Sequence, residues 1–332
     1  MEKVAATYTG KYAEDELLNQ INLSAGLAAT YLLGMQNKDG YWYDYRLPVG
    51  VSDEWVTGFV GRSLQAWVPE HSSLFKAAGA LLDQRLYQAG WGYNKHTGAD
   101  ADSTANVILF LKSLEVTVPA ADQEFLLAHQ QQDGGFSTYL DNQGWSCSHP
   151  DVTPMVFMAL SGAFQKLCAD NVKRYLTDNC EKGCLWSAYW WRNCFYSCFH
   201  NSRLMMEYLG VDIVKPISML QKGDFINHKE PFQVASAFDL AWLCGLYWLF
   251  VKETGNEVLR TIAITLTQEL IDQQQNDGSW AGSSSLRVTD PATLVLPVGD
   301  SAKGNYFVDH NHTVSTASAL QVFGLALEVL ED

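Results

Sequence analysis

A short turn that contains glycine and an aromatic residue recurs along the whole chain and restricts the folds that the sequence can adopt. Each copy follows one apolar, helix-like stretch and precedes another. The turn aromatics are, in order, Trp42, Trp91, Phe136, Trp186, Phe225 and Trp280, so successive copies are 39 to 55 residues apart. Self-similarity at such a period is the sequence signature of repeat architectures. We therefore expect six similar units, of which the fifth, around Phe225, is degenerate.

Three of the turns also place a glutamine before the glycine, in the segments Gln36–Gly40, Gln132–Gly135 and Gln275–Gly278. A glycine after a helix supplies the left-handed cap that lets the chain reverse. We expect the glutamine and the aromatic residue of each turn to join neighbouring units at the rim of the fold.

Apolar residues on both sides of the turns follow the period of an α-helix. The first such stretch contains Leu17, Ile21, Ala25, Ala28 and Leu32, and the next contains Val56, Phe59, Val60, Ser63 and Leu64. Two helices per unit, six times, predict an all-α fold, an (α/α)6 toroid with an inner and an outer ring that forms a single domain over residues 1–332. An open solenoid is the alternative. A closed ring would enclose a cavity, and the inner helices would begin at its mouth.

The composition narrows the range of ligands. Hydrophobic residues make up 47% of the chain, and the net charge of −15 opposes binding to nucleic acid or to an anionic membrane. The longest apolar run, 240–251, is too short to span a bilayer. The seven cysteines, without a secretory pattern at the start of the chain, favour free thiols in the cytoplasm. These features fit a neutral, apolar small molecule as the partner.

Two aspartates and a serine lie where the second inner helix is expected to begin, in the segment Asp100-Ala-Asp102-Ser103. One interpretation is helix capping, because Asp and Ser accept hydrogen bonds from the free amides of a helix N-terminus. The other is an acid made from paired carboxyls, because two neighbouring carboxyls can share one proton and one of them then stays neutral.

The segment Asp100-Ala-Asp102-Ser-Thr-Ala, after a Gly-Trp turn, resembles the Asp-x-Asp-Asp-Thr-Ala signature of squalene–hopene cyclases and related class II, proton-initiated terpenoid cyclases. The turns also resemble the repeats of that superfamily, which includes the β-subunits of protein prenyltransferases. The resemblance implies that Asp102 protonates an alkene of an isoprenoid or isoprenoid-bearing small molecule, with Asp100 as its partner and without a metal or other cofactor. Ser103 replaces the third aspartate of the signature.

The third unit contains His149-Pro-Asp151-Val-Thr153, which resembles a His-Pro-Asp-Val-Thr stretch of many class II cyclases. Some members of that family place an acid-orienting histidine in the following turn, where this chain has Met155. His149 is therefore a candidate for that role. The alternative is a residue just outside a helix that begins with proline.

Further candidates for substrate contacts lie near the expected starts of inner helices. Trp191, Phe195 and Phe199 form a stripe at helical spacing, which is typical of a core but could also stabilise a carbocation. Asp239 lies in an apolar stretch, where a carboxylate needs a partner. The full set of predicted substrate contacts is Trp55, Phe59, Asn106, Trp190, Trp191, Phe195, Phe199, Asp239 and His312.

Two other functions remain as alternatives. His312, near the start of the last inner helix, resembles the zinc-binding histidine of prenyltransferase β-subunits. Those enzymes also need Asp-x-Cys at an earlier inner-helix start, and Asp178-Asn-Cys180 lies on the wrong side of its turn, so we expect no metal site. The second alternative is a non-catalytic carrier of a lipid or polyketide tail. A single barrel also suggests a short substrate or a partner, either a second copy or another protein.

Overall fold

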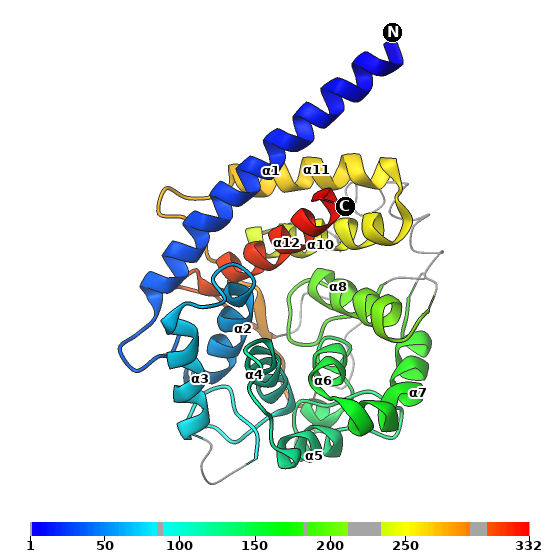
Figure 1. Cartoon of the computed structure of the whole chain (residues 1–332). Coiled ribbons are helices and arrows are strands. Elements are labelled where there is room, and N and C mark those ends of the chain that lie inside the picture. Colours follow the sequence, from blue (N-terminus) through cyan, green and yellow to red (C-terminus); the bar gives the residue numbers. More distant parts are fainter. Residues whose placement is uncertain are drawn as a thin grey trace.

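In the computed structural model the helices from α1 to α8 alternate along the chain between an outer and an inner ring, and so do those from α10 to α12 (Figure 1). The outer helices are α1 (Glu2–Met35), α3 (Ser72–Gln84), α5 (Ala120–Ala128), α7 (Gly162–Asp178) and α11 (Glu257–Asp272). The inner helices are α2 (Glu54–Gln65), α4 (Ala101–Ser113), α6 (Thr153–Ala159), α8 (Phe195–Arg203), α10 (Ala237–Thr254) and α12 (Thr313–Glu331). The structure describes residues 2–84, 89–141, 143–181, 185–211, 234–292 and 304–331. The degenerate turn around Phe225 lies outside these ranges.

The inner ring is closed. Each inner helix contacts the next, from α2 through α4, α6, α8 and α10 to α12, and α12 packs against α2. In the outer ring α1 packs against α11, so the first and last units meet there as well. The prediction of an all-α toroid is confirmed, and the contact between the first and last inner helices rules out an open solenoid.

The turn aromatics are held by the same bonds from unit to unit. The indole Nε1 of Trp42 donates to the main-chain oxygen of Leu32, ten residues earlier, at 2.6 Å. Trp91, Trp186 and Trp280 make the equivalent bond to Leu81, Leu176 and Leu270. The main-chain amides of Trp42, Trp91, Phe136 and Trp280 donate to Thr57, Thr104, Thr153 and Thr316 in the first turns of the inner helices. Each turn thus joins the outer helix before it to the inner helix after it.

Glutamines join neighbouring units, but not all in the predicted register. Gln36 Nε2 donates to the main-chain oxygen of Ser73 in α3 at 2.8 Å. In the last unit Gln274, rather than Gln275, donates to the main-chain oxygen of Ser24 and accepts from its hydroxyl, which ties the last turn to α1. Gln130, rather than Gln132, bonds the glycine of the third turn.

A glycine permits the close approach at the ring closure. Gly278 has a φ of +90°, which side-chain-bearing residues rarely adopt, and a Cβ at this position would overlap the main chain of Leu27 in α1. The turn can therefore lie directly against the first outer helix.

Two short antiparallel strand pairs add to the helical prediction. They are β1 (Asp44–Leu47) with β2 (Gly50–Ser52), and β3 (Leu286–Val288) with β4 (Asn305–Phe307). β2 leads directly into α2, β4 precedes α12, and β1 contacts β4. The two pairs therefore lie together at the end of the ring where these two inner helices begin.

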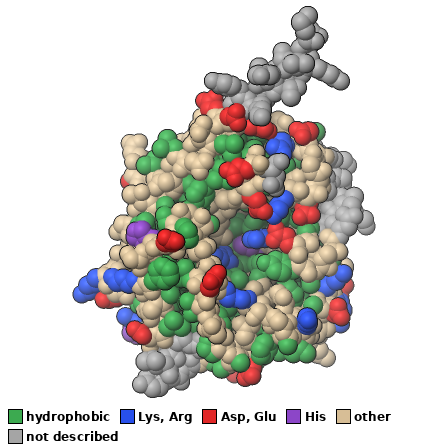
Figure 2. Space-filling model, viewed as in Figure 1, with side chains coloured by type: hydrophobic (Ala, Val, Ile, Leu, Met, Phe, Trp, Pro, Cys, Tyr) green, Lys and Arg blue, Asp and Glu red, His purple; other side chains and the backbone are tan. Residues whose placement is uncertain are grey.

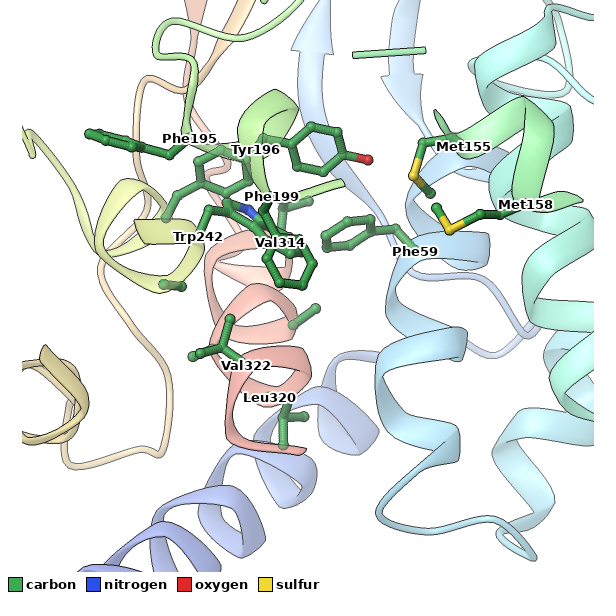
Figure 3. Close-up of a cluster of buried hydrophobic side chains, with 14 of the residues drawn as sticks. Phe59, Met155, Met158, Phe195, Tyr196, Phe199, Trp242, Val314, Leu320 and Val322 are labelled. Carbon is green, nitrogen blue, oxygen red and sulfur yellow. The ribbon is translucent and has the colours of Figure 1, made fainter. Parts of the chain in front are cut away.

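The middle of the ring is filled by an aromatic plug formed by Phe59 of α2, Tyr196 and Phe199 of α8, and Trp242 of α10 (Figure 3). These four side chains are at most 5% exposed. The Trp242 ring centroid lies 5.1 Å from those of Tyr196 and Phe199 and 6.4 Å from that of Phe59. Because these rings come from three inner helices, they occupy the space that the ring encloses.

Within the described part of the chain, one helix, α12, is long and apolar enough to cross a membrane by length and composition. It is a member of the inner ring, and 67% of its apolar window is buried inside the protein. Packing in the core of the toroid accounts for this composition. On the face shown in Figure 2, acidic and basic side chains of the described residues are interspersed and do not form a continuous basic area.

Candidate active site

A cavity of about 390 Å³, here called the aromatic chamber, opens at the end of the ring where the inner helices begin. Its aromatic walls are Tyr45, Trp55, Tyr93, Tyr139, Trp145, Trp190, Trp191 and Phe307. Its polar residues include Thr97, Asp100, Asp102, Ser103, Thr138 and Asn305. Its size and its largely apolar lining, with a few polar groups, are typical of a small-molecule site.

Asp102 lies in the first turn of α4 and lines the aromatic chamber. Trp55 Nε1 donates to Asp102 Oδ2 at 2.8 Å, and Asn106 Nδ2 lies 3.3 Å from Oδ1. Protein surrounds the side chain, yet it keeps accessible surface where it meets the aromatic chamber. The carboxyl can therefore reach a molecule inside the cavity.

Asp100 caps the same helix. Its Oδ1 accepts from the Ser103 main-chain amide at 2.8 Å, and its Oδ2 accepts from the Ser103 hydroxyl at 2.7 Å. The capping interpretation is therefore confirmed for Asp100. The hydroxyl of Ser103, which replaces the third aspartate of the signature, bonds Asp100 and supports the cap.

The environments of the two carboxyls shift their pKa values by different amounts. Burial raises the pKa of Asp102 well above its usual value, and the nearby carboxylates of Asp100 and Asp151 raise it further. Burial raises the pKa of Asp100 only to about 6, because the Ser103 bonds stabilise its charged form. The surroundings of Asp102 therefore favour its protonated form more strongly than the surroundings of Asp100 favour that of Asp100.

Other buried carboxylates near the starts of the inner helices bind main-chain amides. Glu54 accepts a hydrogen bond from the Gly92 amide. Asp151 accepts from the amides of Tyr189 and Trp190, and Asp309 accepts from those of Ser283 and Ser315. These bonds fasten loops to the ring. The carboxyl of Asp102 accepts instead from two side chains and lines the aromatic chamber, which sets it apart from these three.

His149 lies behind the wall of the aromatic chamber. Its Nε2 is 2.9 Å from the main-chain oxygen of Gly144, which can only accept, so Nε2 carries the hydrogen and Nδ1 accepts from the Thr138 hydroxyl at 3.0 Å. Burial lowers the pKa of His149 to about 4. The neutral ring stacks on Tyr189 at 4.0 Å. Both nitrogens thus bond groups other than Asp102, and the ring supports Thr138 in the wall.

The structure divides the predicted substrate contacts into separate groups. Trp55, Trp190 and Trp191 line the aromatic chamber, and Asn106 lies beside Asp102. Phe59 and Phe199 belong to the aromatic plug, and Phe195 lies in the same buried cluster (Figure 3).

The last two predicted contacts lie elsewhere. Asp239 lines a different, more polar pocket of about 430 Å³ together with Arg192 and Ser283 to Ser285. His312 precedes α12, and its Nδ1 is 3.3 Å from the Ser279 hydroxyl. Among the residues that the structure describes, no three His, Cys, Asp or Glu side chains come together as metal ligands would. The cysteines Cys168, Cys194, Cys198 and Cys244 are buried free thiols.

Five aromatic residues of the chamber were not predicted: Tyr45, Tyr93, Tyr139, Trp145 and Phe307. All five lie outside the apolar stretches whose helical period predicts which residues share a face. A sequence signal does exist for three of them, since Tyr45, Tyr93 and Tyr139 each follow a turn aromatic by two or three residues. Because the turn leads toward the start of an inner helix, a second aromatic at this spacing faces the mouth of the ring.

The sequence matches no protein-family model and no curated protein. Among solved structures, the type II terpene cyclase MstE from Scytonema is similar, with a TM-score of 0.80 and 23% identity over 94% of this chain and 99% of MstE. An MstE variant bound to its substrate, geranylgeranyl dihydroxybenzoate, gives a TM-score of 0.79 at 23% identity over 95% of this chain and 99% of MstE. The ent-copalyl diphosphate synthase from Streptomyces platensis gives 0.59 at 16% identity, over 82% of this chain and 50% of that protein. The chain therefore has the α/α toroid fold of the type II terpene cyclases.

Proposed function

We propose that the chain is a class II-type terpenoid cyclase. Asp102 protonates a carbon–carbon double bond of an isoprenoid or isoprenoid-bearing small molecule and thereby starts a carbocationic cyclisation. The observation that carries the proposal is the position of Asp102, a carboxyl whose surroundings favour its protonated form, at the wall of a chamber lined largely by aromatic rings.

An alkene is a very weak base, so its protonation requires a strong acid that still holds its proton at neutral pH. Burial and the carboxylates of Asp100 and Asp151 favour the protonated form of Asp102. Once the proton has left, the Trp55 N–H and the N-terminus of α4 stabilise the carboxylate that remains. The same residues therefore hold the proton before the reaction and accommodate the charge after it.

The walls suit a carbocation. Tyr, Trp and Phe rings attract a cation through their faces, with each contact worth roughly 0.5–2 kcal/mol. An enclosed site also limits the water that would trap the cation. The indoles of Trp55 and Trp191, whose centroids lie 5.8 Å apart, are placed to share this role next to the acid.

The cavity and the similar structures support the proposed substrate class. A chamber of about 390 Å³ with a mainly apolar lining suits a folded isoprenoid chain better than a polar ligand. The substrate of MstE, geranylgeranyl dihydroxybenzoate, joins such a chain to an aromatic acid. We therefore take this compound as the first probe.

The test is incubation of the protein with geranylgeranyl dihydroxybenzoate and, in parallel, with an extract that contains linear isoprenoids. Mass spectrometry should reveal cyclic products isomeric with an input polyene. Asp102→Asn should reduce their rate of formation by about 10²- to 10⁴-fold. Asp309→Asn is the matched control, because Asp309 is another buried carboxyl near an inner-helix start that binds main-chain amides, and it should retain cyclisation.

Undiminished cyclisation by Asp102→Asn would contradict the assignment of the acid. Recovery of every polyene unchanged, with the same affinity in the wild type and in Asp102→Asn, would favour the carrier function instead.

A further inference from the structure

The indole of Trp55 packs against two other aromatic side chains. Its ring stacks on Phe59 with centroids 5.1 Å apart and planes 13° apart, and it lies 5.8 Å from Trp191. Only 6% of Trp55 is exposed. Since the ring cannot turn without disturbing both neighbours, its N–H has a fixed direction.

The Trp55 N–H donates a hydrogen bond to one of the two carboxyl oxygens of Asp102. An indole nitrogen is a donor only, and Trp55 Nε1 is 2.8 Å from Asp102 Oδ2. Asn106 Nδ2 makes its shorter bond, 3.1 Å, to the main-chain oxygen of Asp102 and lies 3.3 Å from Oδ1. The two carboxyl oxygens are therefore not equivalent, because Oδ2 receives the short, well-placed hydrogen bond.

We propose that Trp55 is a positioning residue that selects the oxygen from which Asp102 delivers its proton. In a neutral carboxyl the carbonyl oxygen is the better acceptor, so the Trp55 N–H holds Oδ2 as the carbonyl and leaves the hydroxyl at Oδ1. This inference rests on the proposed function of Asp102.

During transfer the Oδ1–H bond breaks and a C–H bond forms from the electron pair of the alkene. The former O–H electron pair stays on the carboxylate, and the cationic carbon is left in the substrate. Oδ2 then carries part of a full negative charge, so its bond to Trp55 strengthens as the reaction proceeds. An interaction that is stronger in the transition state than in the resting enzyme accelerates the step.

The chamber offers a matched control residue. Trp190 also lines the wall, and its Nε1 donates at 2.7 Å to the Thr138 hydroxyl rather than to the acid. Trp190→Phe therefore removes an indole N–H from the same chamber without changing the hydrogen bonds of Asp102.

The experiment is infrared difference spectroscopy of the folded protein near neutral pH, which needs no substrate. Subtraction of the Asp102→Asn spectrum from that of the wild type identifies the carbonyl band of neutral Asp102. In Trp55→Phe this band should move to higher frequency, because the carbonyl oxygen loses its donor. It should also persist to higher pH, because the Trp55 bond lowers the pKa of Asp102. In Trp190→Phe both properties should match the wild type.

An Asp102 band at the same frequency in Trp55→Phe as in the wild type would overturn the inference while leaving the acid assignment intact. Absence of any Asp102-dependent carbonyl band in the wild type would instead overturn the proposed function. If Trp55→Phe does not fold, replacement of Trp55 by 3-benzothienylalanine, which keeps the bicyclic shape and lacks the N–H, gives the same readout.

Turnover of geranylgeranyl dihydroxybenzoate supplies a second readout. Trp55→Phe should lower kcat about 10- to 100-fold, since a hydrogen bond to a charged group is lost, and should move the alkaline limb of the kcat profile to higher pH. A fall in kcat without movement of that limb would indicate a merely structural role.

Discussion

The two ends of the inner ring differ in the ionisable residues that they hold. The end where the helices begin holds the buried carboxyls Asp44, Asp53, Glu54, Asp100, Asp102, Asp151, Asp239 and Asp309. The end where they finish holds basic residues in the last turns, including Arg62 of α2, Lys112 of α4 and Lys252 of α10. The helix dipole favours this distribution. An acid at a helix start is therefore no sign of catalysis by itself, because the same position also serves structure.

Contact with the aromatic chamber distinguishes the proposed acid from most of the other buried carboxyls. Of these carboxyls, Asp100 and Asp102 line the aromatic chamber. The side chain of Asp100 caps α4 by accepting hydrogen bonds from Ser103. Deeper in the ring, the aromatic plug uses the same residue types as the chamber walls, but its four side chains are at most 5% exposed and line no part of the chamber. Residue type alone does not distinguish the two regions, whereas packing does.

The largest effect on stability should come from the plug. Trp242→Ala removes a side chain with no exposed surface and should lower the free energy of unfolding by about 3–5 kcal/mol. Trp145→Ala, in the wall of the chamber, removes a partly exposed ring that already borders open space. It should cost less stability and should lower the rate of cyclisation. Chemical denaturation measures the first effect, and equal destabilisation by both variants would contradict the division into plug and chamber.

A smaller effect is expected at the end where the helices finish. Lys112 Nζ donates to the main-chain oxygens of Ala159 and Leu160 at the end of α6, at 3.0 and 3.1 Å. Lys112→Met keeps the apolar stem but loses these bonds, and should lower the free energy of unfolding by about 1–3 kcal/mol. The exposed Lys173→Met should change it by less than ~0.5 kcal/mol. A shift in the pH profile of cyclisation in Lys112→Met would contradict the separation of the two ends.

The smallest effect concerns the structural acids. Burial raises the pKa of Glu54 to about 7, against about 4.3 in an unfolded chain. Glu54 therefore stays protonated to higher pH in the folded protein than in the unfolded chain. The protonated side chain contributes its full stabilisation below the unfolded pKa, and this stabilisation is lost as the pH rises toward 7. In Glu54→Gln the side-chain oxygen can still accept a hydrogen bond from the Gly92 amide. Between pH 5 and 8 the unfolding free energy of this variant should fall less than that of the wild type, by on the order of 1 kcal/mol. Chemical denaturation at the two pH values measures this change in unfolding free energy. An equal change in the wild type and in Glu54→Gln would contradict the assignment.

The ring could be predicted from the sequence because its turns use local chemistry. Gly278 and Trp280 act through a backbone angle and a bond to a residue ten positions earlier, and both leave a fixed spacing in the chain. Asp102 could be placed for the same reason, since it opens a helix that directly follows such a turn. The contacting glutamine was misplaced by one residue at Gln274, because several adjacent polar residues fit the pattern equally well.

The sequence does not predict how far along the inner helices a residue lies from the aromatic chamber. Trp55 and Phe59 are one helical turn apart and face the same way, yet one borders the chamber and the other belongs to the plug. Periodicity specifies the face of a helix and not how far the packing extends along it. Trp145 comes from a short 3-10 helix (Gln143–Ser146) and Phe307 from the strand β4, and the position of such a short element depends on contacts between distant segments, for example between β1 and β4.

The most direct measurement is turnover of geranylgeranyl dihydroxybenzoate in heavy water. The carboxyl of Asp102 exchanges with solvent between turnovers, so the first step should place one deuterium on the carbon that receives the proton. The cyclic product should then be one mass unit heavier, with the label on the ring carbon next to the former terminal cation. A cyclic product without deuterium at that carbon would show that the reaction does not begin with proton transfer from an acid of the protein.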